Sequence, residues 1–163
     1  EQDVGTVGEI ASWRDHDPSI FLGYWEGAKA ANKYIEFDWL RSGDLAYKDN
    51  DGYFWYQGRN DDLIKSAGYR IGPAEVEDTL VRHHLVAEAA VVGKKDIERG
   101  QIVVAFVRLI KDTKPDDSLK SELQSYVKDN LAFYKYPRMI RFVESFPLTS
   151  SGKIQRKKLR EQL

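Results

Sequence analysis

Hydrophobic and polar positions alternate in short runs along the first part of the chain. Residues 8–13 (GEIASW) predict a short strand, and residues 28–34 predict a brief helical turn. The run 40–47 and the aromatic run 53–56 flank a turn that ends in Asp-Gly. Apolar runs on either side of such a turn are typical of a β-hairpin, so this region predicts β structure.

The pattern changes after the polar run 58–62, where we place a domain boundary. Short extended stretches at 63–65 and 69–71 flank the turn Ser66-Ala67-Gly68 and predict a second small hairpin. Pro73 then opens a helix that is expected to run to about His83, with acidic residues near its positive end.

Longer apolar runs predict a sheet covered by helices in the rest of the chain. Strands are expected at 86–92, 102–109 and 139–143, and the charged residues 94–100 are expected to form a loop. A helix follows Pro115, with Ser118 as its N-cap, and residues 155–163 predict a basic closing helix. The fold class is therefore α+β, with a short hairpin and a three-stranded sheet packed by helices.

Composition narrows the protein class. The 163 residues are 42% hydrophobic and 31% charged, no apolar run approaches the roughly 20 residues of a bilayer span, and cysteine is absent. Basic and acidic side chains nearly balance, 25 against 26, yet residues 128–160 hold nine basic side chains and two acidic ones. This cationic segment indicates an anionic partner such as a phosphate group, or else a solvated helix face.

Several familiar catalytic patterns are missing. The histidines do not form an H-E-x-x-H motif, no G-x-S-x-G sequence presents a serine, and Gly152-Lys153 lacks the remaining residues of a phosphate-binding loop. Polar loop residues are left as candidates, each with a structural alternative. Asp44 suits a diol or caps a turn, Arg59 suits a phosphate or forms a surface ion pair, and Lys153 suits a shifting negative charge or is a solvated loop lysine.

Six ordered motifs together resemble the adenylate-forming enzymes, the superfamily of acyl- and aryl-CoA synthetases, nonribosomal peptide adenylation domains and firefly luciferase. The segment 51–76, together with Tyr134-Lys135-Tyr136-Pro137-Arg138, is most similar to medium-chain acyl-CoA synthetases. Two positions depart from the usual family sequence, since His84 and Phe133 stand where proline is common. The six motifs are RSGD at 41–44, DGY at 51–53, GRNDDLIK at 58–65, GYRI at 68–71, EVE at 75–77 and PLTSSGK at 147–153.

The resemblance implies a particular domain organisation. Residues 1–60 are expected to be the β-rich end of a large N-terminal domain, and residues 61–163 a complete, mobile C-terminal domain. The phosphate-binding loop and the acyl pocket would belong to the missing part of the large domain, which would be this chain's partner. The chain is therefore expected to be a fragment that is inactive alone.

The resemblance also implies a two-step reaction of an AMP-forming acid–thiol ligase. A carboxylic acid, expected to be a medium-chain fatty acid, reacts with ATP to give acyl-adenylate and pyrophosphate, and coenzyme A then displaces AMP. Lys153 would be the catalytic residue of the first step. Asp44, Arg59 and Lys153 would bind the nucleotide, and Asp61 would be the hinge between the two conformations.

Other residues match positions that line the coenzyme A path, and Arg70 matches a position near the substrate. Mg²⁺ is expected with ATP but liganded outside this chain, and cytoplasmic location is expected, with no nucleic acid and no membrane span. Two alternatives stay open: an adenylation domain that loads a carrier protein, and a non-catalytic module that binds a partner through its basic C-terminal segment. The coenzyme A positions are Ala67, Gly68, Tyr69, Arg99, Lys128, Tyr136, Pro137 and Arg138.

Overall fold

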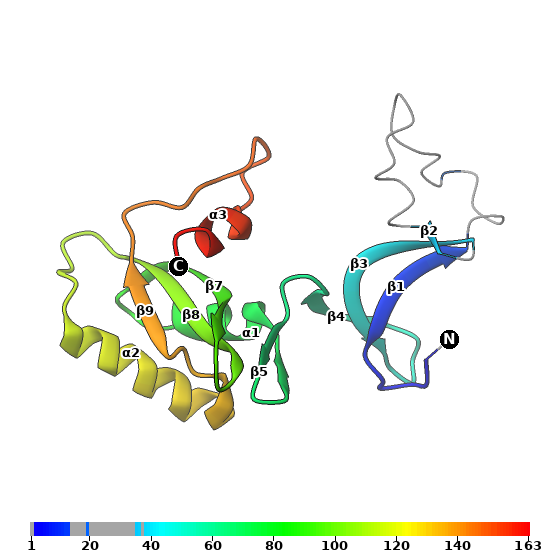
Figure 1. Cartoon of the computed structure of the whole chain (residues 1–163), viewed down its shortest axis with the longest axis horizontal. Coiled ribbons are helices and arrows are strands. Elements are labelled where there is room, and N and C mark those ends of the chain that lie inside the picture. Colours follow the sequence, from blue (N-terminus) through cyan, green and yellow to red (C-terminus); the bar gives the residue numbers. More distant parts are fainter. Residues whose placement is uncertain (1, 14–18, 20–34, 37) are drawn as a thin grey trace. The chain divides into compact units, whose positions relative to one another are not determined.

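The chain folds into two compact units. The computed structural model describes residues 2–13, 19, 35–36 and 38–163, so the helical turn predicted at 28–34 lies outside the described residues. The units are Glu1–Asp61 and Asp62–Leu163 (Figure 1). Each is described by itself below.

The first unit is an antiparallel sheet built around one long strand. Strand β3 (Trp39–Lys48) pairs with β1 (Gly8–Trp13), β2 (Ile35–Glu36) and β4 (Phe54–Arg59). The predicted strand at 8–13 and the predicted hairpin are therefore confirmed.

Strand β4 continues further than the sequence indicates. The polar run at 58 was expected to end the strand, but Gly58 pairs with Leu45 and Arg59 pairs with Asp44. The register shifts between Leu45 and Ala46, and a bulge of this kind accommodates the positive φ of Gly58. The polar residues therefore belong to the ladder, which brings Arg59 to the strand that carries Asp44.

Asp49 fixes the turn of this hairpin. Its carboxylate accepts hydrogen bonds from the backbone N–H groups of Asp51 and Tyr53 and from Trp55 Nε1, the last at 2.7 Å. The Trp55 hydrogen bond is the largest influence that lowers the pKa of the Asp49 carboxyl below its usual value. The ionised side chain therefore organises the turn.

The second unit contains a five-stranded sheet. Its strands are β5 (Ile64–Ser66), β6 (Tyr69–Ile71), β7 (Val86–Asp96), β8 (Gly100–Leu109) and β9 (Met139–Phe142). Their order is β6-β5-β8-β7, with β9 parallel to β8 and the other pairs antiparallel. The α+β class is confirmed. The predicted small hairpin, however, joins the three longer strands in one sheet, because Ser66 pairs with Gly100.

The charged segment 94–100 is mostly strand, contrary to the expected loop. The β7–β8 ladder continues from the core to the pair Asp96–Gly100, which leaves only three residues for the turn. Strand ends that project beyond the core carry polar side chains at little cost. The charged residues therefore led to a predicted hairpin that is shorter than the observed one.

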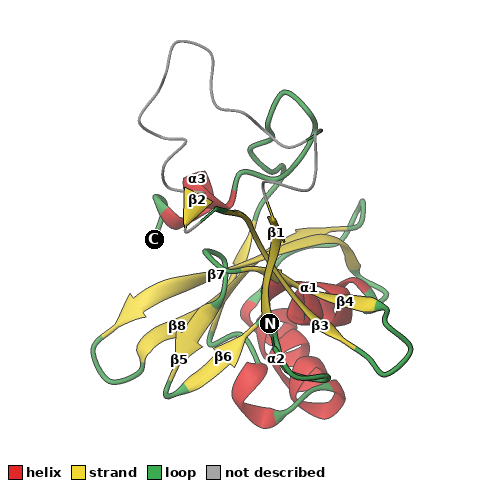
Figure 2. Cartoon of the chain, turned by 90° about the vertical axis from the view of Figure 1, so that its right-hand side faces the viewer, coloured by secondary structure: helices red, strands yellow, loops and turns green. Residues whose placement is uncertain are grey.

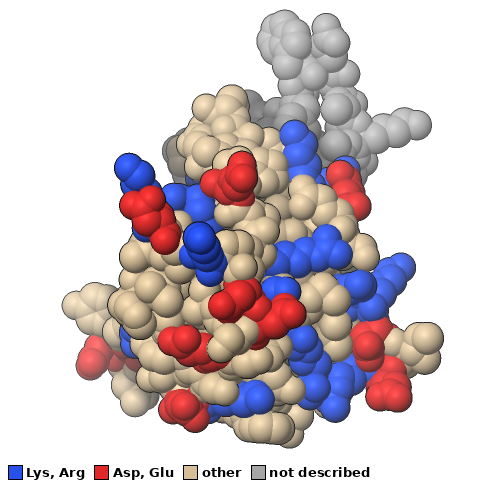
Figure 3. Space-filling view, turned by 90° about the vertical axis from the view of Figure 1, so that its left-hand side faces the viewer, with Lys and Arg blue, Asp and Glu red and all other residues tan. Residues whose placement is uncertain are grey.

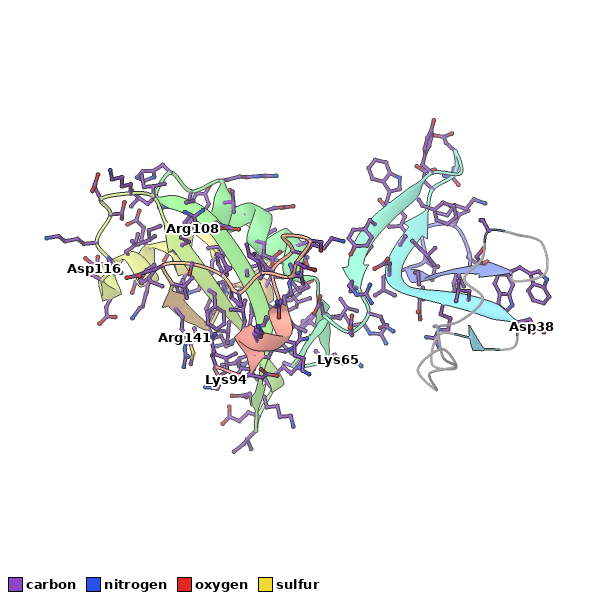
Figure 4. The ribbon with its side chains drawn as sticks, turned by 90° about the horizontal axis from the view of Figure 1, so that it is seen from above. Asp38, Lys65, Lys94, Arg108, Asp116 and Arg141 are labelled. Carbon is purple, nitrogen blue, oxygen red and sulfur yellow. The ribbon has the colours of Figure 1, made fainter. Side chains whose placement is uncertain are left out.

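Three α-helices and one short 3₁₀ turn, η3 (Phe133–Lys135), accompany the sheet. Helix α1 (Pro73–Val81) ends before His83. The His83 side chain is buried, and its Nε2 lies 3.1 Å from Glu122 Oε1. The helix α2 (Asp117–Asn130) begins after Asp116, labelled in Figure 4, whose side chain accepts from Leu119 N–H at 2.7 Å. The N-cap is thus Asp116 rather than Ser118, because the Asp116 carboxylate satisfies the Leu119 N–H of the first turn, which has no partner within the helix.

Helix α3 (Arg156–Arg160) is shorter than the predicted 155–163 segment. It lies on the opposite side of the sheet from α1 and α2 (Figure 2). None of the helices within the described ranges is long and apolar enough to cross a membrane.

The alternation of β8 separates two cores. Val103, Ala105 and Val107 face α1 and α2, whereas Val104 and Phe106 face the C-terminal segment with Phe146 and Leu159. Both faces of the sheet are therefore covered, each by a separate hydrophobic core.

Candidate functional site

Three of the predicted site residues of the first unit lie together. Arg59 Nη1 is 3.2 Å from Asp44 Oδ1, and Arg59 Nε is 3.1 Å from Asp61 Oδ1. The strand pairing of Asp44 with Arg59 produces this proximity, and a hydrogen bond of 2.8 Å from Asn60 N–H to Gly43 O extends it. The three side chains are 34 to 69% exposed, so they remain accessible to a ligand.

Gly43 makes room for the Arg59 guanidinium. Its φ is +79°, and a Cβ atom added there would lie 2.7 Å from Arg59 Nη2. The Gly43 N–H donates to Glu9 Oε1, and Glu9 also binds Arg41. A glycine is therefore required in this bend both by its conformation and by the close approach of the arginine.

Lys153 lies on a tightly braced loop of the second unit. Thr149 N–H donates to Lys153 O at 2.8 Å, and Lys153 N–H donates to Thr149 Oγ1 at 3.0 Å. Gly152, with φ of +80°, completes the turn, and Leu148 bridges to Ile154 beyond it. The backbone is therefore held while the lysine side chain is exposed.

A cluster of aromatic and basic side chains lies on the other face of the sheet. Tyr136 packs against the core that contains α1 and α2, with Lys128 Nζ 4.2 Å from its ring centre. Arg138 Nη1 donates to the Tyr136 hydroxyl at 3.1 Å. Tyr69 stacks on Tyr134 with ring centres 3.9 Å apart. We call these five residues the tyrosine cluster.

The other residues predicted to line the coenzyme A path lie near the first half of β8. Ala67 N–H donates to Arg99 O at 2.9 Å, and Gly68 follows with a φ of +85°. Pro137 is buried, and its carbonyl accepts from Gln124 Nε2 of α2. Arg138 N–H bonds to Val103 O, so this segment and the Ala67 turn both attach to the first half of β8. Arg70 is exposed on β6 next to Tyr69.

Five of the nine basic side chains of the C-terminal segment divide into two groups. Lys135 binds Glu75, Arg156 binds Glu77, and Arg160 binds Asp62. Lys128 and Arg138 instead contact Tyr136. Figure 3 shows that basic and acidic side chains alternate over one face of the molecule rather than forming a uniform cationic surface.

Sequence reasoning missed two contributors to these sites. Tyr134 belongs to the segment 134–138 that resembles medium-chain acyl-CoA synthetases, but nothing in the sequence shows that it stacks on Tyr69. The Glu77–Arg156 pair joins residues 79 positions apart, and no local sequence pattern predicts it. Within the described ranges, no cluster of three acidic or histidine side chains is arranged to hold a metal ion.

Comparison with known proteins relates part of this chain to a known domain family. Residues 75–153, from the first turn of α1 to the Lys153 loop, match the AMP-binding enzyme C-terminal domain. These residues belong to that domain family. The match includes Tyr136, Arg138 and Lys153.

The relatives of this chain are acyl-CoA ligases or synthetases by name. It is 48% identical to the uncharacterized acyl-CoA ligase YtcI of Bacillus subtilis over 97% of the chain and 30% of that protein. It is 48% identical to human mitochondrial acyl-coenzyme A synthetase ACSM2B over 88% of the chain and 25% of that protein. The chain thus spans less than a third of the length of these relatives.

A solved structure extends the similarity to nearly every residue. The o-succinylbenzoate CoA synthetase of Bacillus subtilis, in complex with its acyl-adenylate intermediate, is 34% identical. Its TM-score is 0.83, and the match covers 98% of this chain and 31% of that protein. The two-unit fold is therefore shared with an enzyme that forms an acyl-adenylate.

Proposed function

We propose that this chain is the C-terminal part of an AMP-forming acyl-CoA ligase. The complete enzyme would combine a carboxylic acid with ATP and then transfer the acyl group to coenzyme A. The second unit would be the mobile domain, and the first would complete a larger domain that carries the acyl pocket. The observation that carries this proposal is the placement of the Lys153 loop and the tyrosine cluster on opposite faces of one sheet.

In the first step, a carboxylate oxygen attacks the α-phosphorus of ATP and the bond to pyrophosphate breaks. Negative charge accumulates on the oxygens around phosphorus, and the Lys153 ammonium would stabilise it. Asp44 would accept hydrogen bonds from the ribose hydroxyls, and Arg59 would donate to the nucleotide. The braced backbone of the Lys153 loop supports this role, because a positioned charge needs no reorganisation during the reaction.

In the second step, the coenzyme A sulfur attacks the acyl carbon and AMP leaves. The thin pantetheine chain would pass Ala67, Gly68 and Tyr69, where Gly68 has no side chain. Phosphates at the nucleotide end would meet Lys128, Arg99 and Arg138, and the tyrosines offer flat surfaces to an adenine ring. The charges and ring faces of the cluster therefore fit coenzyme A chemically.

One unit cannot present both faces of its sheet to a single active centre at the same time. Ile154, the neighbour of Lys153, packs on one face, and Tyr136 packs on the other. A rotation of the unit between the two steps would resolve this. The exposed Asp61, the last residue of the first unit, is the proposed pivot.

The test is to measure the two half-reactions separately in the complete enzyme. Lys153→Ala should reduce acid-dependent pyrophosphate exchange by about 100–1000-fold and leave thioester formation from supplied acyl-adenylate nearly unchanged. Tyr136→Ala should raise the KM for coenzyme A and spare the exchange reaction. Lys157→Ala, an exposed lysine of α3, serves as the control.

Other results would contradict the proposal. Equal loss of both half-reactions in Lys153→Ala would remove its assigned role. Transfer to a carrier protein but never to coenzyme A would favour the alternative adenylation domain.

Four finer statements are part of the proposal. A medium-chain fatty acid is the expected substrate, tested with a panel of acids of increasing length. Mg²⁺ would accompany ATP with ligands outside this chain, and the large N-terminal domain would be the partner. A cytoplasmic location stays a prediction, since one relative above is mitochondrial by name.

A further inference from the structure

An ion-pair network joins helix α3 to the first residue of the second unit. Arg156 Nη2 donates to both oxygens of Glu77, at 2.8 and 2.7 Å. Asp62 Oδ1 accepts from Arg160 Nη1 at 2.9 Å, and its Oδ2 lies 3.9 Å from Arg156 Nη1. We call these four side chains the α3 network.

The two carboxylates of the network are shielded from water, whereas the Arg156 and Arg160 side chains are 29 and 36% exposed, and the network is tied to the sheet. The side chains of Asp62 and Glu77 are only 15 and 14% exposed, so their charges are screened less than those of surface pairs. Glu77 Oε1 also accepts from Val91 N–H of β7 at 2.7 Å. The guanidinium of Arg156 is therefore held against α1 and β7 at once.

Arg156 lies three residues beyond Lys153, and the chain between them is held firmly. Gln155 N–H donates to Pro147 O at 2.8 Å, and Ile154 bridges to Leu148 across the loop. Any rotation of α3 would therefore carry the base of the Lys153 loop with it.

Packing alone leaves that rotation weakly determined. Helix α3 has five residues, and Leu159 is its one buried residue. Ile154 and Leu163, which flank the helix, are only partly buried against the same core, and apolar contacts are non-directional, so packing sets the position of α3 more closely than its rotation. Directional hydrogen bonds from two arginines to two fixed carboxylates determine the rotation of the helix.

We propose that Arg156, held by Glu77 and Asp62, is a positioning residue for Lys153 in adenylate formation. Because Asp62 directly follows the proposed pivot Asp61, the same contacts would transmit the rotation of the unit to the Lys153 loop. This inference rests on the proposed function of Lys153. It assigns to part of the basic C-terminal segment an internal role, distinct from the binding of an anionic ligand.

The test uses the complete enzyme and both half-reactions. Arg156→Met and Glu77→Gln should each lower acid-dependent pyrophosphate exchange by about 10–100-fold, the effect expected of a misplacement near 1 Å. Thioester formation from supplied acyl-adenylate should stay within about twofold of the parent enzyme, because none of the contacts described above for the α3 network involves the five residues of the tyrosine cluster. Arg156→Lys should be intermediate, since an ammonium keeps the charge but loses the two-pronged geometry. Lys157→Met, on the same helix, is the control.

A double variant decides whether Arg156 acts through Lys153. If it does, Lys153→Ala with Arg156→Met should exchange pyrophosphate no more slowly than Lys153→Ala alone. Multiplied losses would overturn the inference, as would equal loss of both half-reactions together with a lower melting temperature in Arg156→Met and Glu77→Gln.

Failure of the proposed function would give a different result in the half-reaction measurements. If Lys153→Ala does not separate the half-reactions, the role of Lys153 is wrong and the inference falls with it. If Lys153→Ala separates them and neither network variant does, only the inference is wrong.

Discussion

Replacement of Gly43 by alanine tests the nucleotide site of the first unit through a contact that the structure defines. The added Cβ would lie 2.7 Å from Arg59 Nη2, which is closer than any ordinary contact. The guanidinium is the far end of a flexible side chain, so it will move rather than the backbone. The expected result is loss of the Arg59–Asp44 contact without loss of the strand pairing.

Two effects contribute, and a second glycine separates them. Alanine at φ of +79° costs about 1–2 kcal/mol of stability through backbone strain. Gly52 has φ of +89°, and its added Cβ would meet only Lys48 Cε, at 3.9 Å. Gly52→Ala therefore carries similar strain in the same unit but leaves Arg59 in place. The exposed Arg59–Asp44 pair itself contributes no more than about 1 kcal/mol, so the two variants should melt at similar temperatures.

Their activities should differ much more than their stabilities. A guanidinium moved by about 1 Å should slow acid-dependent pyrophosphate exchange in the complete enzyme by roughly 10–100-fold. Gly52→Ala should stay within about threefold of the parent. Arg59→Ala provides the reference, since adding Gly43→Ala to it should slow exchange no further. Equal rates for Gly43→Ala and Gly52→Ala would refute the reasoning.

Three other predictions concern single residues. Because hydrogen bonding lowers the pKa of Asp49, its carboxylate should stabilise the β3–β4 turn above its usual pKa and lose this effect as the pH falls through the lower folded value. Protection of the Tyr53 amide, measured against its intrinsic exchange rate at each pH, should therefore fall in acid, and Asp49→Asn should remove that pH dependence. Asp116→Ala should destabilise the second unit by about 1 kcal/mol in thermal unfolding, and Ser118→Ala by only a few tenths. Asp61→Pro should suppress one half-reaction and leave the melting temperature unchanged, since proline fixes φ near −65°; equal rates for both steps would exclude residue 61 as the pivot.

Much of the second unit could be predicted from local pattern. The β-branched runs of β7 and β8 and the helical spacing of Leu119, Leu123 and Val127 follow directly from burial on one face. Boundaries were less predictable, because strand ends and helix caps depend on contacts remote in sequence. The pairing of Ser66 with Gly100, which merges the hairpin into the sheet, is such a contact.

The candidate site was predicted by motif rather than by geometry. The motifs indicated Asp44, Arg59 and Lys153 because each keeps its spacing to the neighbouring glycine or strand. They could not indicate that Gly43 faces Arg59, nor that Tyr69 stacks on Tyr134. These facts depend on how separate strands and turns meet after folding.

The basic C-terminal segment shows most clearly what a count of charges leaves out. Nine basic side chains against two acidic ones indicated a binding surface, yet three of the nine have carboxylate partners 60 to 98 residues earlier in the chain. A local count cannot include such partners, because they are adjacent only in the folded unit. The remaining contacts of Lys128 and Arg138 are with Tyr136, whose ring leaves their charge uncompensated by a carboxylate. Two of the cationic side chains without a carboxylate partner therefore lie at the tyrosine cluster, while the arginines of α3 are paired inside the fold near Lys153 and its lysines, Lys157 and Lys158, are exposed.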